Sequence, residues 1–192
     1  IEVPKYFSVK SLDDLTSASE KLGYPKLPFV IKPCVGNGSR GVRILDESVN
    51  EFDLLFREKP NNMYSNLSKI KEIFANHQLP ELLACEYLPG EELTIDTLVA
   101  DGKMLDILIR RRETISNGIS TSGKFIESSV IETYIESIVS SLPGLDGPIG
   151  FQLKKSTNGS FLLIESNPRI QGTSVASNGL GINLPLRSIY SA

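Results

Sequence analysis

The sequence predicts an α+β protein of two lobes, joined near residues 86–90. Amphipathic helical stripes with capping residues occur in both halves, whereas alternating strands grouped as hairpins dominate the second half. Length agrees with this fold class, because a chain of 192 residues can bury roughly 70% of its unfolded surface without a disulfide or metal. We therefore expect an N-terminal lobe over residues 1–86 and a C-terminal lobe over residues 87–192.

The first lobe is expected to alternate helices with short strands. Ser11 begins a helix that ends at Gly23, and Ser48 begins a shorter helix that runs to about residue 57. Asn66 begins a third helix, in which Ile73 belongs to the apolar stripe. The expected strands cover residues 29–32, 42–45 and 82–87.

The second lobe reads mostly as hairpins. Strands over 93–99 and 104–109 flank the two-residue turn Asp101-Gly102, and a polar loop with Gly118 and Gly123 follows. Ser129 then caps a helix with an apolar face. The last hairpin joins residues 149–153 to 161–164 around Asn158-Gly159.

Composition excludes several functional classes. The net charge of −3 argues against broad nucleic-acid binding, and no apolar run approaches the length of a membrane span. Cys34 and Cys85 lie in apolar surroundings and are expected to be buried thiols, which is consistent with a cytoplasmic protein. The single histidine, His77, makes Ser-His-Asp hydrolysis and histidine-rich metal sites improbable. The missing initiator Met and the apolar C-terminus suggest a piece of a longer protein.

A glycine-rich loop follows the first buried strand. Its sequence fits G-x-G-x-x-G, but a strand and not a helix is expected after it, which argues against a dinucleotide fingerprint. A flap whose backbone N–H groups approach phosphates fits better, although a plain hairpin turn would give the same pattern. Lys32 ends the preceding strand, where its ammonium could neutralise phosphate oxygens or simply be solvated. The loop residues concerned are Gly36, Gly38, Ser39, Arg40 and Gly41.

The final hairpin carries the strongest group of polar residues. If Asn158-Gly159 is a two-residue turn, Thr157 pairs with Ser160 and Gln152 lies opposite Glu165. Strand alternation then puts Asn167 on the face of Glu165. These oxygen-bearing side chains suit magnesium, and Arg169 follows where it could meet the same phosphates. A polar strand end with a turn is the alternative.

Four segments in order resemble the ATP-grasp superfamily, in particular its carbamoyl-phosphate-synthase-like and amino-acid-ligase branches. They are Lys32, the glycine loop, residues 86–92 and the E-x-N-P-R run of residues 165–169. The resemblance implies the ATP-grasp fold, in which two α+β lobes clasp ATP between antiparallel sheets. It covers nearly the whole chain.

The resemblance also implies residue roles. Glu86 and Leu88 would offer backbone groups to adenine with Tyr87 between them, and Glu92 would bind the ribose hydroxyls unless it is an exposed strand charge. Gln152, Glu165 and Asn167 would hold two Mg²⁺ ions, with Mn²⁺ as an alternative metal, while Lys32 and Arg169 would act on the transferring phosphoryl group. Arg110 and Arg112 share a strand face and would point at phosphates or substrate, a solvated edge being the alternative. The loop 114–124 and the segment 172–174 would contact substrate.

The implied reaction is ATP- and Mg²⁺-dependent activation of a carboxylate as an acyl phosphate, followed by attack of an amine. Small-molecule carboxylate and amine substrates are the expected partners, without nucleic acid or membrane, and a homodimer is compatible with this activity. A non-catalytic nucleotide-binding or regulatory module is the alternative. A protein kinase is excluded, since Lys32 precedes the glycine loop and no H-R-D or D-F-G segment is present.

Overall fold

The structure, a computed structural model, describes residues 1–36, 38–57, 63–116 and 119–190. The chain forms two compact units, one of Pro4–Tyr87 and one of Leu88–Ala192 together with Ile1–Val3. The expected division at 86/87 differs from this at Tyr87, which belongs to the first unit, and at the first three residues. They count with the C-terminal unit because the Leu163 N–H and the Tyr134 hydroxyl both donate to the carbonyl of Glu2.

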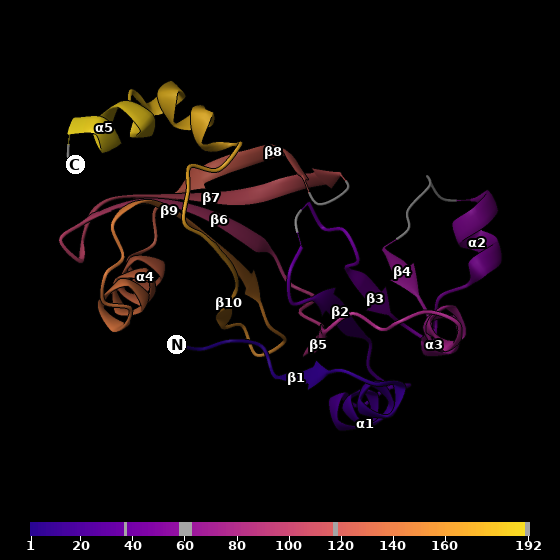
Figure 1. Ribbon diagram of the computed structural model, residues 1–192. Helices are drawn as coiled ribbons and strands as arrows, with labels where there is room; N and C mark the ends of the chain where they lie inside the picture. Colours follow the sequence, from indigo (N-terminus) through magenta and orange to yellow (C-terminus); the bar gives the residue numbers. More distant parts are fainter. Residues whose placement is uncertain (37, 58–62, 117–118, 191–192) are drawn as a thin grey trace. The chain divides into compact units, whose positions relative to one another are not determined.

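The described elements alternate helices and strands in the first unit and are strand-rich in the second (Figure 1). In chain order they are β1 (Tyr6–Val9), α1 (Leu12–Leu22), β2 (Phe29–Pro33), β3 (Arg43–Leu45), α2 (Glu51–Phe56), β4 (Tyr64–Ser65), α3 (Leu67–Ala75), β5 (Leu82–Glu86), β6 (Glu92–Ala100), β7 (Lys103–Ser116), β8 (Ile119–Ile126), α4 (Ser129–Ser141), β9 (Gly147–Lys155), β10 (Phe161–Asn167), the 3-10 helix η1 (Ser174–Leu180) and α5 (Leu184–Tyr190).

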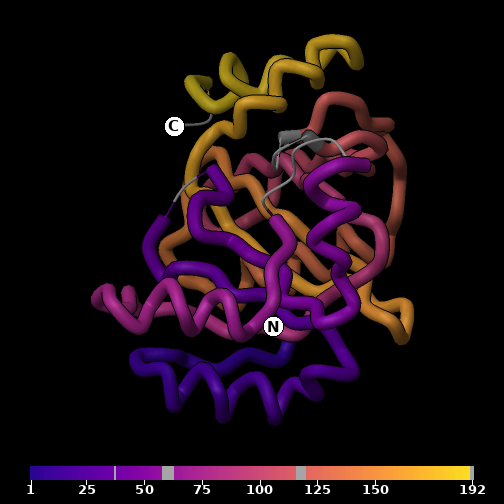
Figure 2. Tube along the Cα trace, turned by 90° about the vertical axis from the view of Figure 1, so that its right-hand side faces the viewer, coloured from indigo at the N-terminus to yellow at the C-terminus, as the bar shows by residue number. Residues whose placement is uncertain are grey.

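The N-terminal unit is built on a five-stranded sheet in the order β1-β5-β2-β3-β4. Helices α1 and α3 lie on the same side of this sheet (Figure 1 and Figure 2) and share one core with its covered face. The limits of α1 follow the prediction, since the Ser11 side chain accepts from the Asp14 N–H and Gly23 ends the helix in a left-handed conformation, φ +93°. Lys32 falls on the opposite face of β2 from the buried Phe29 and Ile31.

Two predicted helix starts and one predicted core residue are wrong. Asn50, not Ser48, caps α2, because its side chain accepts from the Phe52 N–H while Ser48 bonds to Asp46. Ser128, not Ser129, caps α4. Ile73 of α3 is 50% exposed, since only the other apolar residues of that stripe face the sheet.

The C-terminal unit is an antiparallel sheet in the order β10-β9-β6-β7-β8. Its apolar face packs against α4 and forms a core around Phe151, Leu153 and Ile135. Helices η1 and α5 lie on the other side of the sheet (Figure 1). Leu184 of α5 is buried there against Leu98 and Leu108. One face of the sheet is therefore covered by α4 over an apolar core, and the other face is covered only in part, where Leu184 of α5 packs on it.

The predicted polar loop over residues 114–124 is wrong in its conformation. Strand β7 continues to Ser116 and β8 begins at Ile119, so most of the segment is paired antiparallel strand with bulges near Thr114. Gly118 of the predicted loop lies outside the described residues. Within the part of the chain that the structure describes, no helix is both long and apolar enough to cross a bilayer.

Candidate functional site

One face of the C-terminal sheet carries polar side chains from adjacent strands, and we call it the polar face. Strand pairing places one row across it, formed by Arg110, Thr94, Gln152 and Glu165. Side-chain contacts and pairing place a row on each side of it, one with Arg112, Glu92 and Lys154 and one with Asp96, Gly150 and Asn167. All residues predicted as metal ligands thus belong to one surface.

The hairpin β9–β10 brings the predicted metal ligands together. Glu165 pairs directly with Gln152, as expected, and Asn167 Nδ2 donates to Glu165 Oε1 at 2.6 Å. Glu165 is exposed, whereas Gln152 and Asn167 are half-buried. Arg169 follows after a tight turn in which its N–H donates to the Asn167 carbonyl, and its side chain is exposed. Glu165 and Arg169 are therefore exposed near the end of β10, and the half-buried Gln152 and Asn167 lie beside Glu165.

The turn of this hairpin differs from the prediction although the pairing of its ligands does not. The Ser156 N–H donates to the Ser160 carbonyl at 2.8 Å, so Ser160 pairs with Ser156 and not with Thr157. The loop holds three residues, and its Gly159 has φ +92°. A bulge at Ile164 then shifts the register by one residue and restores the pairing of Gln152 with Glu165.

The donor set at this hairpin fits a hard divalent cation. Among the described residues, no three His, Cys, Asp or Glu side chains gather closely enough to hold a metal. A metal here would therefore take the Glu165 carboxylate together with amide oxygens of Gln152 and Asn167. Magnesium accepts such oxygens and keeps several positions for water and phosphate, so the set matches its preferences.

Glu92 lies in a charged group and is not an isolated surface charge. Its carboxylate accepts a hydrogen bond from Arg112 Nη1, and Lys154 Nζ lies 3.4 Å from its other oxygen. The side chains of Glu92 and Arg112 are 11% and 5% exposed. The alternatives of an exposed strand charge for Glu92 and a solvated edge for Arg112 are therefore wrong. Ribose binding by Glu92 stays a prediction.

Arg110 is buried and held by protein groups. Its Nη1 and Nη2 donate to the carbonyl and hydroxyl of Thr173, and Nη2 lies 3.6 Å from the Asp96 carboxylate. Burial lowers the pKa of the Arg110 guanidinium below its ordinary value, and the nearby Asp96 carboxylate opposes that shift. The solvated-edge alternative is wrong for Arg110 as well, and a direct contact with phosphate finds no support in this burial. Ser174 is also buried, which leaves it no exposed surface for the predicted substrate contact.

The N-terminal unit carries the predicted phosphate-binding residues. Lys32 is half-buried near the end of β2 and shares its sheet face with Cys85, whose thiol pKa is raised by burial. Cys34 is exposed, contrary to prediction, because it follows the strand end.

The glycine loop joins β2 to β3, so no helix follows it and the dinucleotide fingerprint is excluded. Gly38, Ser39 and Gly41 have φ between +58° and +76°, a backbone that glycine adopts readily. Gly36, Gly38, Arg40 and Gly41 are exposed and Ser39 is half-buried. Residue 37 of the loop lies outside the described residues. The strand–loop–strand arrangement is confirmed, while phosphate binding stays a prediction.

Residues 86–88, predicted to meet adenine, follow β5. The Glu86 N–H donates to the Lys5 carbonyl at 2.8 Å, so a backbone contact from Glu86 to a base would come from its carbonyl. Tyr87 is half-buried, and burial raises the pKa of its hydroxyl. Leu88 is 5% exposed.

The sequence profile of a family described as ATP-grasp in the biosynthetic pathway with Ter operon matches residues 78–192, more than half of the chain. The chain belongs to the ATP-grasp family. This assignment confirms the resemblance to the ATP-grasp superfamily and the ATP-grasp fold. Of the four segments that carried the resemblance, residues 86–92 and the E-x-N-P-R run of residues 165–169 lie within the matched part.

Sequence similarity to one characterised protein covers nearly the whole chain. The L-arginine-specific L-amino acid ligase of Bacillus subtilis is 26% identical over 184 residues, which are 92% of this chain and 41% of that protein. The chain thus spans about two-fifths of the length of this relative.

Several solved structures share the fold of this chain at low sequence identity. The biotin carboxylase β,γ-ATP complex from Campylobacter jejuni has a TM-score of 0.67, 17% identity, and coverage of 100% of this chain and 42% of that one. The N5-carboxyaminoimidazole synthetase of Staphylococcus aureus complexed with ADP has a TM-score of 0.63 and 18% identity, and the match covers 93% of this chain and 43% of that one. An ATP-grasp ligase complexed with a minimal precursor, Mg and ADP has a TM-score of 0.59 and 14% identity, and the match covers 100% of this chain and 54% of that one.

Sequence reasoning missed several residues of the polar face in this ATP-grasp chain. Asp96 is 4% exposed and Gln171 is 8% exposed, and the two are hydrogen-bonded. Lys154 completes the charged group around Glu92. Asp96 carried a usable signal, since a carboxylate within the apolar run 93–99 requires a buried partner. Gln171 gave no local signal, because its partners are distant in sequence.

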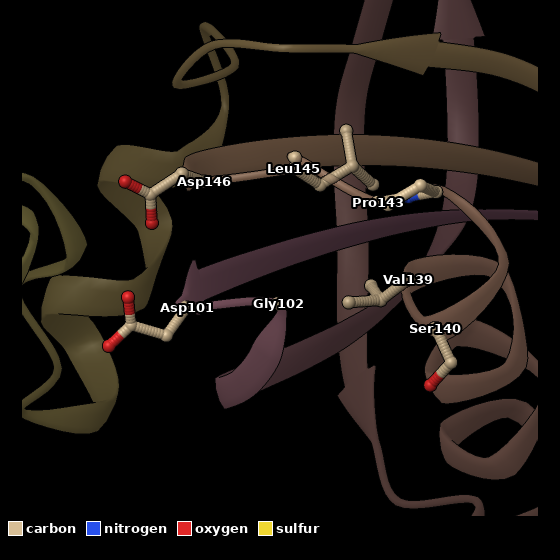
Figure 3. Close-up of a pocket in the computed structure, with 8 residues that line it drawn as sticks. Asp101, Gly102, Val139, Ser140, Pro143, Leu145 and Asp146 are labelled. Atoms are coloured by element: carbon tan, nitrogen blue, oxygen red, sulfur yellow. The ribbon is translucent and has the colours of Figure 1, made fainter.

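A pocket with a volume of about 480 Å³ lies at another part of the C-terminal unit (Figure 3). Figure 3 shows the carboxylates of Asp101 and Asp146 on the same side of the view. The lining residues come from the β6–β7 turn, the end of α4 and the loop after it: Asp101, Gly102, Val139, Ser140, Pro143, Gly144, Leu145 and Asp146. None of them belongs to the predicted nucleotide or metal site.

Proposed function

We propose that the protein is an ATP- and Mg²⁺-dependent carboxylate–amine ligase. The γ-phosphoryl group of ATP passes to a carboxylate, which releases ADP, and an amine then attacks the acyl phosphate and displaces phosphate. The observation that carries this proposal is the group of Gln152, Glu165 and Asn167 on the polar face, with Glu165 exposed and Arg169 two residues after Asn167. Membership of the ATP-grasp family supports it.

The roles proposed for the residues follow from their charge and exposure. Glu165, Gln152 and Asn167 hold the metal, which when bound neutralises negative charge on the phosphate oxygens. Arg169 presents an exposed guanidinium whose donors suit the phosphoryl oxygens. Lys32 and the backbone N–H groups of the glycine loop bind the polyphosphate.

The proposed contacts to the nucleoside are separate from these phosphate contacts. Glu86, Tyr87 and Leu88 bind adenine, and Glu92 binds the ribose hydroxyls. Glu92 is already paired with Arg112 and Lys154, which orients its carboxylate. Arg112 therefore contributes by holding Glu92.

The relatives support the proposed substrate class. An L-amino acid ligase relative favours an amino acid as the carboxylate, and the ligase structure with Mg and ADP favours the proposed cofactors. A small-molecule carboxylate and an amine are thus the proposed substrates. We also propose a cytoplasmic location, because both cysteines are free thiols.

The test is ADP release by the full-length protein with ATP, Mg²⁺ and a panel of amino acids, singly and in pairs. Release that requires both the metal and particular amino acids is the expected result. Tight ATP binding without release for any acceptor would instead identify a non-catalytic nucleotide-binding module. The Glu165→Ala variant serves as the matched inactive control.

A further inference from the structure

The turn that follows Arg169 is fixed to the polar face by buried side chains. The Ser174 N–H donates to the Gln171 carbonyl at 3.1 Å, which closes a four-residue turn over Gly172 and Thr173. Within it, the Gln171 N–H donates to the Ser174 hydroxyl at 3.1 Å. Gly172 is exposed, whereas Gln171 and Ser174 are 8% and 1% exposed. The turn thus has a buried base and an exposed tip.

Asp96 of β6 holds one side of this turn. Its Oδ1 accepts hydrogen bonds from Gln171 Nε2 at 3.1 Å and from the Ser174 hydroxyl at 2.5 Å. Gln171 Nε2 also donates to the Ile95 carbonyl at 3.1 Å. Because Asp96 is 4% exposed, these bonds take the place of water at Oδ1, whereas Oδ2 accepts no hydrogen bond from the described residues and lies 3.6 Å from Arg110 Nη2.

Arg110 of β7 holds the other side. Its two terminal nitrogens donate to the Thr173 carbonyl and hydroxyl at 2.6 and 2.5 Å. The guanidinium also lies over the Phe125 ring, 5.8 Å from its centroid, and 3.6 Å from Asp96. Contacts with Phe125 and Asp96 therefore orient the planar guanidinium toward Thr173.

The Gln171 side chain packs directly against Gly150 of β9, where a side chain on residue 150 would otherwise lie. A Cβ added at Gly150 would lie 2.3 Å from Gln171 Cδ and 2.4 Å from its Cγ, so any other residue there displaces this side chain. Arg169 lies between Asn167, the last residue of β10, and Gln171. Its backbone is thereby held on both sides, by the sheet and by the anchored turn.

We propose that Asp96, Arg110 and Gln171, seated on Gly150, form a turn clamp that positions Arg169 and the tip of the turn for phosphoryl transfer. This inference rests on the proposed function and adds positioning residues to it. The three side chains act through Arg169 and do not contact the reacting groups. Gly150 is required because its missing side chain leaves the space that Gln171 fills.

The experiment uses the full-length protein with Gly150→Ala, Gln171→Ala and the double variant. Gly150→Ala is expected to lower kcat by about 10²-fold, the scale of a 1 Å misplacement, while ATP affinity changes much less, because the proposed contacts of Lys32, the glycine loop and Glu92 are not altered. In the Gln171→Ala background, Gly150→Ala should add little, since the displaced side chain is gone. Gly179→Ala is the matched control, because a Cβ there meets nothing within 4 Å.

Amide hydrogen exchange over residues 169–174 gives a readout that needs no turnover. Gly150→Ala should speed exchange at the Ser174 amide, and Gly179→Ala should not. Wild-type exchange and kcat in Gly150→Ala, or losses that multiply in the double variant, would overturn the turn clamp while leaving the proposed function intact. Absence of ADP release by the wild-type protein would overturn the proposed function, and with it the link between the clamp and phosphoryl transfer.

Discussion

The polar face has an open half and a closed half, and the two differ in what covers them. The open half contains Glu165, which is exposed, and Gln152 and Asn167, which are half-buried. The closed half contains Asp96 and Arg110, which are 4% exposed because the turn after Arg169 returns over them. Strand pairing alone therefore does not decide whether a polar residue binds a ligand or stabilises the fold. Whether a later segment of the chain folds back over the polar residue also decides its role.

The largest expected effect is on the closed half. Arg110→Ala leaves the buried Asp96 carboxylate without its cation and should lower the free energy of unfolding by about 3–5 kcal/mol. Chemical denaturation measures the loss. Arg111→Ala is the control, because the Arg111 side chain is 41% exposed and its pairing with Glu113 should contribute at most about 1 kcal/mol. Equal losses in the two variants would contradict the division of the face.

Removing a ligand of the open half should affect activity and not stability. Glu165→Ala is expected to lower kcat by at least about 10²–10³-fold, as for loss of one preorganised electrostatic group. Its unfolding midpoint should stay near that of the wild type, because Glu165 is exposed. Ser166→Ala, the exposed neighbour on the opposite strand face, is the control for both assays. Near-normal kcat in Glu165→Ala would remove the metal assignment.

A third prediction extends the comparison to the exposed glycine loop of the N-terminal unit. Gly38 has φ +58°, so Gly38→Val costs about 1–2 kcal/mol in backbone strain and blocks close approach of an anion. We expect the Kd for ATP, measured by calorimetry, to be roughly tenfold larger. Gly102→Val introduces similar strain at φ +71° in the β6–β7 turn and should leave the affinity unchanged. Unaltered affinity in Gly38→Val would rule out the phosphate role of the loop.

The smallest effect is expected at Lys154, which lies between the two halves in exposure. Its ion pair with Glu92 is 3.4 Å long and its side chain is 28% exposed, so Lys154→Ala should cost less than about 1 kcal/mol of stability. Arg112→Ala should cost clearly more, because the Arg112 side chain is 5% exposed against the same carboxylate. Thermal unfolding of the two variants compares them directly, and a reversed order would be inconsistent with this account.

The sequence predicted those parts of the fold and site that depend on local pattern. The Ser11 cap, the strand–loop–strand arrangement after Lys32 and the pairing of Gln152 with Glu165 all follow from short-range rules. The last was obtained from a wrong turn, since the bulge at Ile164 offsets the three-residue loop. Strand alternation predicts which face a side chain lies on, but it cannot predict a bulge that offsets a longer turn.

The parts that the sequence did not predict depend on contacts between distant segments. Arg110 and Thr173 are 63 residues apart, and nothing near either residue indicates that they meet. Strand alternation placed Arg110 on the correct face but could not show that the chain returns to cover it. For the same reason Gln171 was missed and Ser174 was assigned to substrate.

In the proposed function, the open half of the polar face holds a divalent cation beside ATP. Anomalous diffraction from crystals of the full-length protein grown with Mn²⁺ and a non-hydrolysable ATP analogue tests it most directly. The expected result is a manganese peak at coordination distance from Glu165, flanked by the amide oxygens of Gln152 and Asn167. A nucleotide-bound crystal whose manganese lies elsewhere, with these three side chains uninvolved, would contradict it.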